Sequence, residues 1–291
     1  MATSAFEIEL SARALRLKNA CEPRDELIPI DSRVGVGTAR KGARQRLWAF
    51  ATGVVRNRPR VRSLIDVARF LAHSTGGDVC TCTLCGKTGR FLPMGSPPRN
   101  NAGCPGCASM ERHRLFGLYL RQHPEVVAGK LVLHFAPERP VAAAVRATNP
   151  ELYRTADIEV GRADLQLSLE KIDLPDESVD VVIASHILEH VDDKLALAEL
   201  RRILTPGGKA IIMVPIVEGW DETYENDAVK TNAERARHFG QEDHVRVYGR
   251  DLRARIAAAG LTLAEFTASA QDCLNHGIQR GEKIFIAIKA A

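Results

Sequence analysis

The chain lacks any apolar run approaching the roughly 18 residues that a helix needs to cross a bilayer. Its first twenty residues include Glu7 and Glu9, and they lack the apolar block and cleavage site of a secretory signal peptide. The first absence argues against a membrane-spanning helix and the second against export. We therefore expect a cytoplasmic protein that has no membrane partner.

Acidic residues are absent between Asp31 and Asp66, although the net charge of the whole chain is only +4. The basic residues in this interval are Arg33, Arg40, Lys41, Arg44, Arg46, Arg56, Arg58, Arg60 and Arg62. A run of one sign forms a local basic face or a solvated arm. We assign residues 1–75 to a basic, mainly helical N-terminal extension, whose role the sequence leaves open.

Cysteine is scarce, since the chain has seven, yet five of them lie between Cys80 and Cys107. Thiols stay reduced in the cytoplasm, so a metal explains this concentration better than disulfides do. Two C-x2-C pairs stand in the interval, Cys82 with Cys85 and Cys104 with Cys107. Paired knuckles of this kind predict a closed, structural four-cysteine zinc site.

Two alternatives to this zinc site stay open at this point. Cys80 is a fifth thiol close by that can replace Cys82 as a ligand. An iron–sulfur cluster also accepts four thiolates, although the knuckle spacing favours zinc. We assign residues 76–128 to a small zinc-knuckle module. A chain of 291 residues allows about two domains, so a larger one is expected to follow.

The segment from Ser178 to Pro215 reads as strand, helix and strand in unbroken order. Val179 to Ala184 is a nearly continuous apolar run, which suits a parallel strand buried on both faces. Ser185 and His186 end that strand, where open α/β sheets bind their ligands. The sequence Pro206-Gly207-Gly208 is expected to stop the following helix before the next strand.

The words SVD, SHILEHV, ELRRILTPGG and the strand after them resemble the class I S-adenosylmethionine-dependent methyltransferases. The resemblance covers roughly Leu131 to Ala290. Within the class the chain resembles a bacterial, methyltransferase type 11-like branch that carries an HFAPE turn, a CPxCxSxxRHR knuckle and a DHVRxYG block. The resemblance implies a Rossmann-like, doubly wound, mostly parallel α/β sheet over residues 129–291, with S-adenosylmethionine as the cofactor.

The resemblance also assigns cofactor residues to the turn after the first strand, Leu131 to Phe135. By position His134 replaces the acid of the class, Ala136 its first glycine and Glu138 its second. Ser185 and His186 complete the predicted cofactor edge. The altered glycines also allow a degenerate cofactor fold that is kept only for binding.

The second strand ends in Asp157, which by resemblance holds the two ribose hydroxyls, with Glu159 in reserve. Ser168 stands where the class has an acid that contacts the adenine amino group, and Asp164 is the alternative. The backbone N–H of Leu169 is expected to meet the ring. The segment between Asp157 and the next apolar stretch is too short for a usual crossover, so we expect that helix to be missing or reduced.

Residues 215–248 form a long polar insertion, which we interpret as a lid or acceptor pocket over the carboxyl edge of the sheet. The predicted acceptor-binding residues are Tyr224, Glu225, Arg246 and Tyr248. Methyl transfer to oxygen or nitrogen calls for one nearby base, and the candidates, in order, are His244, His186 and His238.

The chain has no [ND]-P-P-[FYW] motif for amino-group methylation and no Pro-Cys pair for attack on a pyrimidine ring. The remaining acceptors are polar: a saccharide, a small metabolite or a peptide. One alternative is a zinc-ribbon methyltransferase that binds RNA through its basic segment. Another is a non-enzymatic binding module. The sequence leaves the acceptor atom and the oligomeric state open.

Overall fold

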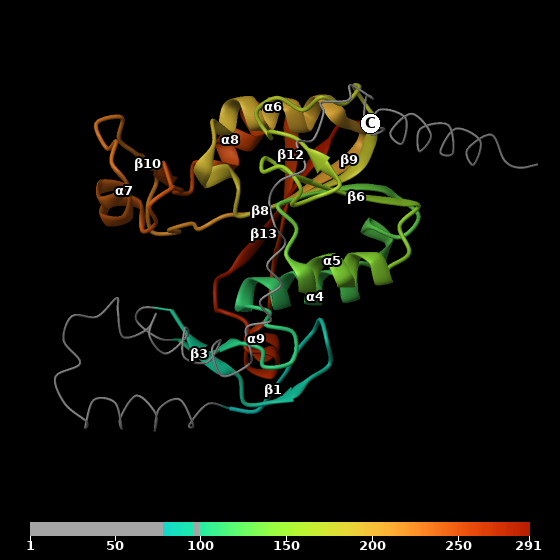
Figure 1. Ribbon diagram of the computed structural model, residues 1–291, viewed down its shortest axis with the longest axis vertical. Coiled ribbons are helices and arrows are strands. Elements are labelled where there is room, and N and C mark those ends of the chain that lie inside the picture. Colours follow the sequence, from blue (N-terminus) through green and yellow to red (C-terminus); the bar gives the residue numbers. More distant parts are fainter. Residues whose placement is uncertain (1–77, 96–98) are drawn as a thin grey trace, which may run out of the picture.

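A computed structural model describes residues 78–95 and 99–291, so the extension expected over residues 1–75 lies outside the described residues. A seven-stranded sheet forms its centre, in the order β12-β13-β9-β8-β5-β6-β7 (Figure 1). The strands are β5 (Leu131–Phe135), β6 (Leu152–Asp157), β7 (Leu165–Gln166), β8 (Val179–Ser185), β9 (Leu204–Met213), β12 (Leu261–Thr267) and β13 (Lys283–Lys289). Paired strands are parallel except where β13 runs antiparallel to β9 and β12. The expected Rossmann-like, mostly parallel sheet is confirmed.

Helices cover both faces of this sheet. Helices α6 (Asp193–Ile203) and α8 (Leu252–Ala258) pack on one face, and α4 (Glu111–Gln122), α5 (Arg139–Ala147) and α9 (Ala270–His276) pack on the other (Figure 1). Along β5, Leu131 and Leu133 join the first core while Val132 joins the second. This alternation is what a strand between two helical layers requires.

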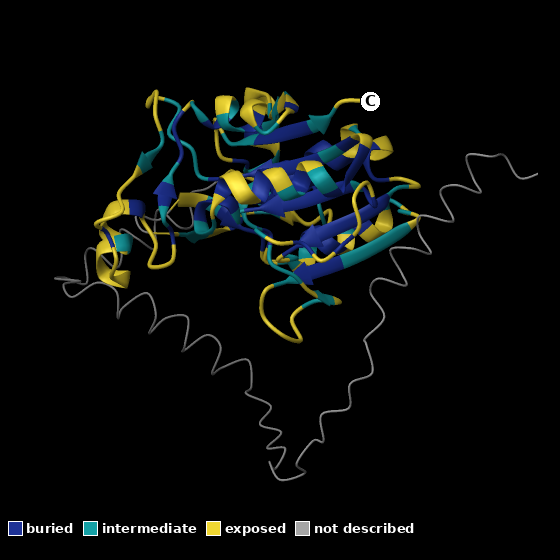
Figure 2. Cartoon of the chain, turned by 90° about the horizontal axis from the view of Figure 1, so that it is seen from above, coloured by how far each residue is buried: buried dark blue, intermediate teal, exposed yellow. Residues whose placement is uncertain are grey.

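The central strands are the most buried part of the fold, as Figure 2 shows in dark blue. All five residues of β5 are buried, and β8 is buried except at Asp180, as the apolar run Val179 to Ala184 predicts. The Asp180 carboxylate accepts hydrogen bonds from the Leu131 backbone N–H at 3.0 Å and from the Thr205 hydroxyl at 3.0 Å. This aspartate of the SVD word therefore ties together the starts of three neighbouring strands.

The Pro206-Gly207-Gly208 turn differs from its prediction. Helix α6 ends at Ile203 and β9 begins directly at Leu204, so the three residues lie inside the strand. The register between β8 and β9 shifts there, which marks a bulge. A Cβ on Gly208 would meet the Thr205 carbonyl oxygen at 2.8 Å, and Gly207 has a φ of +74°. The glycines therefore permit a bulge and do not end the helix.

The link between β6 and β7 contains no helix, which confirms the expected loss of a crossover helix. Residues 158–164 form only turns between the two parallel strands. Ile158 and Val160 are consequently exposed, at 67% and 79%. The link from β6 to the edge strand β7 therefore places no helix over this part of the sheet.

Two smaller substructures flank the sheet. The first cysteine knuckle is the turn between β1 (Cys80–Thr81) and β2 (Thr88–Gly89), and the second follows the hairpin of β3 (Leu92–Met94) and β4 (Arg99–Gly103). The insertion holds β10 (Tyr224–Glu225), α7 (Asn232–Phe239) and β11 (Arg246–Val247). Short 3-10 turns are η1 (Pro124–Val126) and η2 (Leu188–His190). Within the ranges that the structure describes, no helix has the length and apolar character to traverse a membrane.

Candidate functional site

The four paired cysteines converge at one point. Their sulfurs all lie within 4.8 Å of one another, with Cys82 Sγ 3.7 Å from Cys107 Sγ and Cys85 Sγ 3.7 Å from Cys104 Sγ. A tetrahedral zinc with bonds of about 2.3 Å places its sulfurs about 3.8 Å apart. The arrangement therefore fits a four-thiolate metal site.

Tight knuckle turns aim these thiols inward. The Gly86 N–H donates to the Cys82 carbonyl at 3.0 Å, and the Ala108 N–H donates to the Cys104 carbonyl at 2.9 Å. Gly86 and Ala108 occupy equivalent places with φ of +72° and +59°. The two C-x2-C segments thus fold alike, although only the first has the glycine that suits this conformation.

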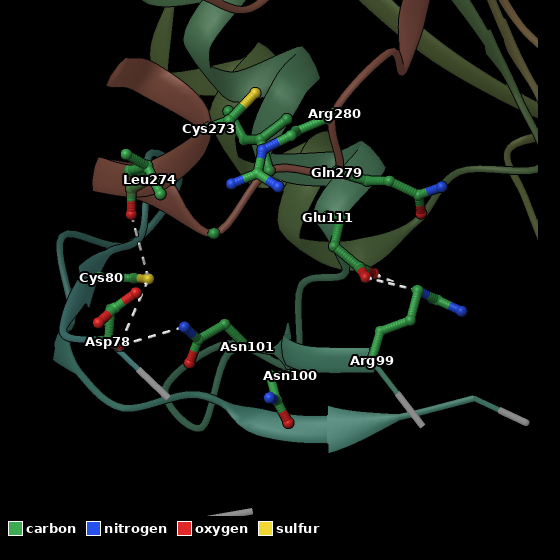
Figure 3. Close-up of a pocket in the computed structure, with 12 residues that line it drawn as sticks. Asp78, Cys80, Arg99, Asn100, Asn101, Glu111, Cys273, Leu274, Gln279 and Arg280 are labelled. Atoms are coloured by element: carbon green, nitrogen blue, oxygen red, sulfur yellow. Dashed lines mark hydrogen bonds and ion pairs between the residues drawn. The ribbon is translucent and has the colours of Figure 1, made fainter. Parts of the chain in front are cut away.

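Cys80 points away from this cluster. Its sulfur lies 3.5 Å from the Leu274 carbonyl oxygen and 3.6 Å from that of Asp78 (Figure 3). The set of convergent ligand atoms includes Cys82 and leaves Cys80 out. Between the two alternatives, the geometry favours Cys82 as the fourth ligand.

Arg114 fastens the knuckles to the larger domain. Its guanidinium is fully buried and donates to the carbonyl oxygens of Ala102 and Ser109 beside the cysteines. The same group donates to the carbonyls of His276, at 2.7 Å, and Gly277 at the end of α9. The structure of the knuckles is therefore coupled to the loop that leads into β13.

The turn after β5 carries the expected cofactor residues at the carboxyl edge of the sheet. Ala136 has a φ of +44°, the left-handed conformation that a glycine adopts easily. Its N–H donates to the Ala156 carbonyl at 2.8 Å, which keeps the turn against β6. The turn therefore retains a glycine-like shape although its residue has a Cβ.

Glu138 lies between two buried histidines. Its carboxylate is 3.4 Å from His113 Nε2 of α4 and 3.5 Å from His134 Nε2 of β5. Because His113 Nδ1 accepts the Met110 N–H, its proton is on Nε2, facing Glu138. Burial alone would raise the pKa of Glu138, but the two histidines outweigh it and hold that pKa well below its usual range. His113, which follows the second knuckle in the sequence, thus supports the turn after β5.

Replacing Glu138 by glutamine is expected to lower the free energy of unfolding by about 1–3 kcal/mol at neutral pH, since the histidines lose their ionised partner. Because the pKa is depressed in the folded protein, this stabilisation is present above the unfolded value of about 4.3 and is lost as the pH falls below it. Urea unfolding between about pH 7 and pH 3.5 measures the difference between wild type and variant.

Glu125→Gln is the matched control, because Glu125 pairs with His123 at 3.3 Å on the surface. Its effect is expected to stay within about 0.5 kcal/mol. A Glu138→Gln effect that does not change with pH would contradict the electrostatic role.

The ends of β6 and β7 carry the other expected cofactor residues. Asp157 ends β6 partly exposed, and its Oδ1 accepts the Glu159 N–H at 2.9 Å. Ser168 and the buried Leu169 follow β7 at the same edge. Asp164, the alternative to Ser168, accepts hydrogen bonds from the Thr155 backbone N–H and hydroxyl, both at 2.9 Å. Its carboxylate is engaged within the strand pair.

A cavity of about 490 Å³, here called the edge cavity, opens at the carboxyl edge of the sheet. Its walls come from His186 after β8, residues 214–218 after β9, residues 279–283 before β13, and Arg112 from α4. The charged residues lining it are Arg99, Arg112, Arg280, Lys283, Glu111, Glu218 and Glu282. Burial raises the pKa of Glu282, and nearby His186 and Arg112 partly offset this rise. The cavity suits a polar ligand.

His186 is held in this wall by a carboxylate. Its Nδ1 lies 3.1 Å from Glu189 Oε1, and its Nε2 is buried without a hydrogen-bond partner. An ionised carboxylate only accepts, so the ring hydrogen is on Nδ1 and Nε2 carries a lone pair. His186 also has a φ of +55°, and its N–H donates to the Met213 carbonyl at 2.7 Å. The ring is thus oriented as a proton acceptor.

A smaller cavity of about 220 Å³ adjoins the knuckles (Figure 3). It shares Arg99, Glu111, Gln279 and Arg280 with the edge cavity, and Arg99 pairs with Glu111 at 2.7 Å between them. No local motif in the sequence marks residues 279–283 as part of a site. The signal was topological, since the residues before an antiparallel strand lie at the carboxyl end of its parallel neighbours.

The insertion residues divide into two groups. Tyr224 and His238 form a pair at 2.7 Å between hydroxyl and Nδ1, and neither lines the two cavities. Arg246 donates to the carbonyls of Leu188 and Val191 and pairs with Glu225. The predicted acceptor residues Glu225 and Arg246 are therefore occupied by contacts within the protein.

Two further residues of the insertion are deeply buried. Tyr248 is fully buried, and its hydroxyl donates to the Leu188 carbonyl at 3.1 Å and contacts the Asp193 carboxylate at 3.2 Å. His244 is 4% exposed, with Nδ1 3.2 Å from the Phe239 carbonyl oxygen and Nε2 against the Gln241 amide. Burial lowers the pKa of His244, which favours its neutral form. Neither side chain reaches the edge cavity.

Comparison with known proteins agrees with this frame. Residues 126–212, which include β5, β6, β7, β8 and nearly all of β9, match a family model described as a methyltransferase domain. No curated protein matches the chain. The match lies over the parallel strands whose carboxyl ends form the polar edge of the sheet.

Solved structures with a similar fold are distant in sequence. An S-adenosylmethionine-dependent methyltransferase from Mesorhizobium loti has 13% identity and a TM-score of 0.42, over 60% of this chain and 97% of that one. Burkholderia thailandensis 1,6-didemethyltoxoflavin-N1-methyltransferase, solved with S-adenosylhomocysteine, has 13% identity and a TM-score of 0.43, over 91% and 99%. The [4+2]-cyclase SpnF has 15% identity and a TM-score of 0.45, over 62% and 81%.

Proposed function

We propose that this chain is an S-adenosylmethionine-dependent methyltransferase that acts on an oxygen or nitrogen atom of a polar acceptor. The observation that carries the proposal is the carboxyl edge, where the turn after β5, Asp157 and His186 come from neighbouring strands of one sheet. The methyltransferase-domain match over residues 126–212 supports the same reading. Acceptors of the proposed class are saccharides, small metabolites and peptides.

The residues at this edge fit the cofactor. The left-handed backbone at Ala136 keeps the turn open for the methionine part. His134 and Glu138 form a buried polar pair at this turn, with 3.5 Å between Nε2 and Oε2. The Asp157 carboxylate is partly exposed and suits two ribose hydroxyls, because it accepts both hydrogen bonds at once. Ser168 and the backbone N–H of Leu169 are the proposed contacts to the adenine.

When bound, S-adenosylmethionine supplies a methyl group activated by a sulfonium, which leaves as a neutral thioether. His186 Nε2 would take the proton that the acceptor oxygen or nitrogen gives up. Glu189 orients the ring and stabilises the imidazolium that forms. His186 therefore stands first among the three candidate bases, since His244 is enclosed and His238 pairs with Tyr224.

The charged walls of the edge cavity support a polar acceptor. Arg99, Arg112, Arg280 and Lys283 face Glu111, Glu218 and Glu282, so both signs are present. This balance favours a neutral or zwitterionic polar molecule over a nucleic acid, whose phosphates need a basic surface. The RNA alternative rests on the basic residues between Asp31 and Asp66, which lie outside the described residues.

We further propose that the four cysteines hold a structural zinc. Four thiolates complete a tetrahedral site and leave no position for water, so the metal holds the fold. We also propose a cytoplasmic location, because thiols that hold a metal stay reduced there.

Titration calorimetry with S-adenosylmethionine and S-adenosylhomocysteine tests the cofactor site. Asp157→Ala is expected to weaken binding by about 10–100-fold, because hydrogen bonds to a charged group are lost. Glu159→Ala is the matched control: Glu159 is exposed and pairs with Arg162, so binding is expected to be unchanged. Absence of binding by the zinc-loaded wild type would overturn the enzyme proposal in favour of the binding module.

A further inference from the structure

Three side chains of the metal-ligating type converge beside the edge cavity. Glu189 and His190 belong to η2, and His244 belongs to the insertion. One ligand atom from each lies within 4.8 Å of the others. The Val245 N–H donates to the Glu189 carbonyl at 2.9 Å, which holds the two segments together. The cluster is therefore built by tertiary structure, from residues more than fifty positions apart.

The carboxylate of this cluster has one unpartnered oxygen. Glu189 is 1% exposed, and its Oε1 accepts from His186 Nδ1 at 3.1 Å. Its Oε2 is buried and has no hydrogen-bond partner. Leaving a buried charged oxygen unsatisfied is costly, so such an atom calls for a ligand.

Each histidine is oriented through one ring nitrogen. His190 Nδ1 lies 3.3 Å from the Asp243 carboxylate, and His244 Nδ1 lies 3.2 Å from the Phe239 carbonyl oxygen. Both partners accept, so Nδ1 carries the hydrogen and Nε2 carries the lone pair in each ring. Metal-bound histidines characteristically donate their other N–H to a carboxylate or a backbone carbonyl.

We propose that Glu189 Oε2, His190 Nε2 and His244 Nε2 bind a divalent first-row transition metal such as Zn²⁺ or Co²⁺. Two imidazoles and one carboxylate suit these ions and leave positions open, unlike the four-thiolate site. Bonds of about 2.1 Å draw the three atoms to about 3.0–3.5 Å apart. Binding requires side-chain rotations that bring these atoms together and turn the Gln241 amide away from His244 Nε2.

The test of this metal site measures bound metal and not methyl transfer, so its outcome is independent of the proposed activity. The full-length protein is dialysed to equilibrium with Zn²⁺ and its metal is measured by mass spectrometry. The wild type is expected to hold about two equivalents, one at each site. Glu189→Gln and His244→Ala are expected to hold about one, as is Cys104→Ala, which loses the other metal.

His123→Ala is the matched control, since His123 is an exposed histidine that pairs with Glu125 far from the cluster in sequence. It is expected to keep both equivalents. Asp243→Ala leaves all three ligands in place and removes only the His190 partner, so the affinity for the second Zn²⁺ is expected to fall by about 10–100-fold.

A wild type that binds metal only at the cysteines, or Glu189→Gln and His244→Ala proteins that keep the second equivalent, would overturn the site. If either variant fails to fold, Asp243→Ala decides the question, because it changes an exposed side chain. An unchanged affinity in that variant, with a second equivalent bound, places the metal elsewhere.

Discussion

Replacing His186 by alanine is expected to lower kcat for methyl transfer by about 10²–10⁴-fold, the range that a positioned base supplies. The reason is geometric: Nε2 is buried at the wall of the edge cavity with no partner, and Glu189 holds Nδ1. The affinity for S-adenosylmethionine is expected to change little. The measurement is initial rate with an acceptor found by screening sugars, metabolites and peptides, together with cofactor calorimetry.

His238→Ala is the comparison that ranks the candidate bases. His238 pairs with Tyr224 and lines neither cavity, so kcat is expected to stay within about threefold of wild type. Activity of His186→Ala within the same range would remove His186 from the role of base. A loss confined to His238→Ala would move the acceptor to the insertion.

Replacing Cys104 by alanine is expected to remove about one equivalent of zinc and to unfold the protein cooperatively at a much lower temperature. Structural zinc contributes about 10–16 kcal/mol of apparent binding free energy in small zinc domains. The loss is expected to spread, because Arg114 joins the knuckle carbonyls to those of His276 and Gly277. Metal analysis and thermal unfolding measure both effects.

Cys80→Ala is the matched control for this experiment. Cys80 is as buried as the ligands Cys82 and Cys104, but its sulfur contacts the Leu274 and Asp78 carbonyl oxygens. It is expected to keep its zinc. Loss of zinc from the Cys80→Ala protein would contradict the assignment of Cys82 as the fourth ligand.

Local pattern anticipated much of the fold. The apolar run at Val179 to Ala184 became the buried centre of β8, since a strand covered on both faces needs apolar residues at every position. The sequence pattern predicts less well which side of helix α6 packs against the sheet. Leu195 is 53% exposed, because the buried stripe of α6 follows Ala196, Leu197 and Leu200. The choice of stripe depends on the sheet beneath it.

The candidate site was anticipated unevenly. The sequence predicts His186 as a site residue, because open α/β sheets bind ligands at the ends of their parallel strands; its role as base stays a prediction. His244 was ranked above it from its residue type alone, and only the packing of the insertion encloses its ring. Glu189, which orients His186, was overlooked inside the LEHV word. Its contact with His186 depends on the φ of +55° at His186, which the spacing of the two residues in the sequence does not reveal.

The sequence by itself determined the parts that depend on neighbours along the chain: the alternation of strands and helices, the two cysteine knuckles and the short β6 to β7 link. Their physics is local, since periodicity, turn residues and ligand spacing act within a few positions. Only the tertiary structure decided the parts that join distant segments. Arg114 meets the carbonyls of residues 276 and 277, the edge cavity gathers six segments, and Glu189 lies beside His244. These contacts follow from how the layers pack, because burial and orientation are set by the whole core.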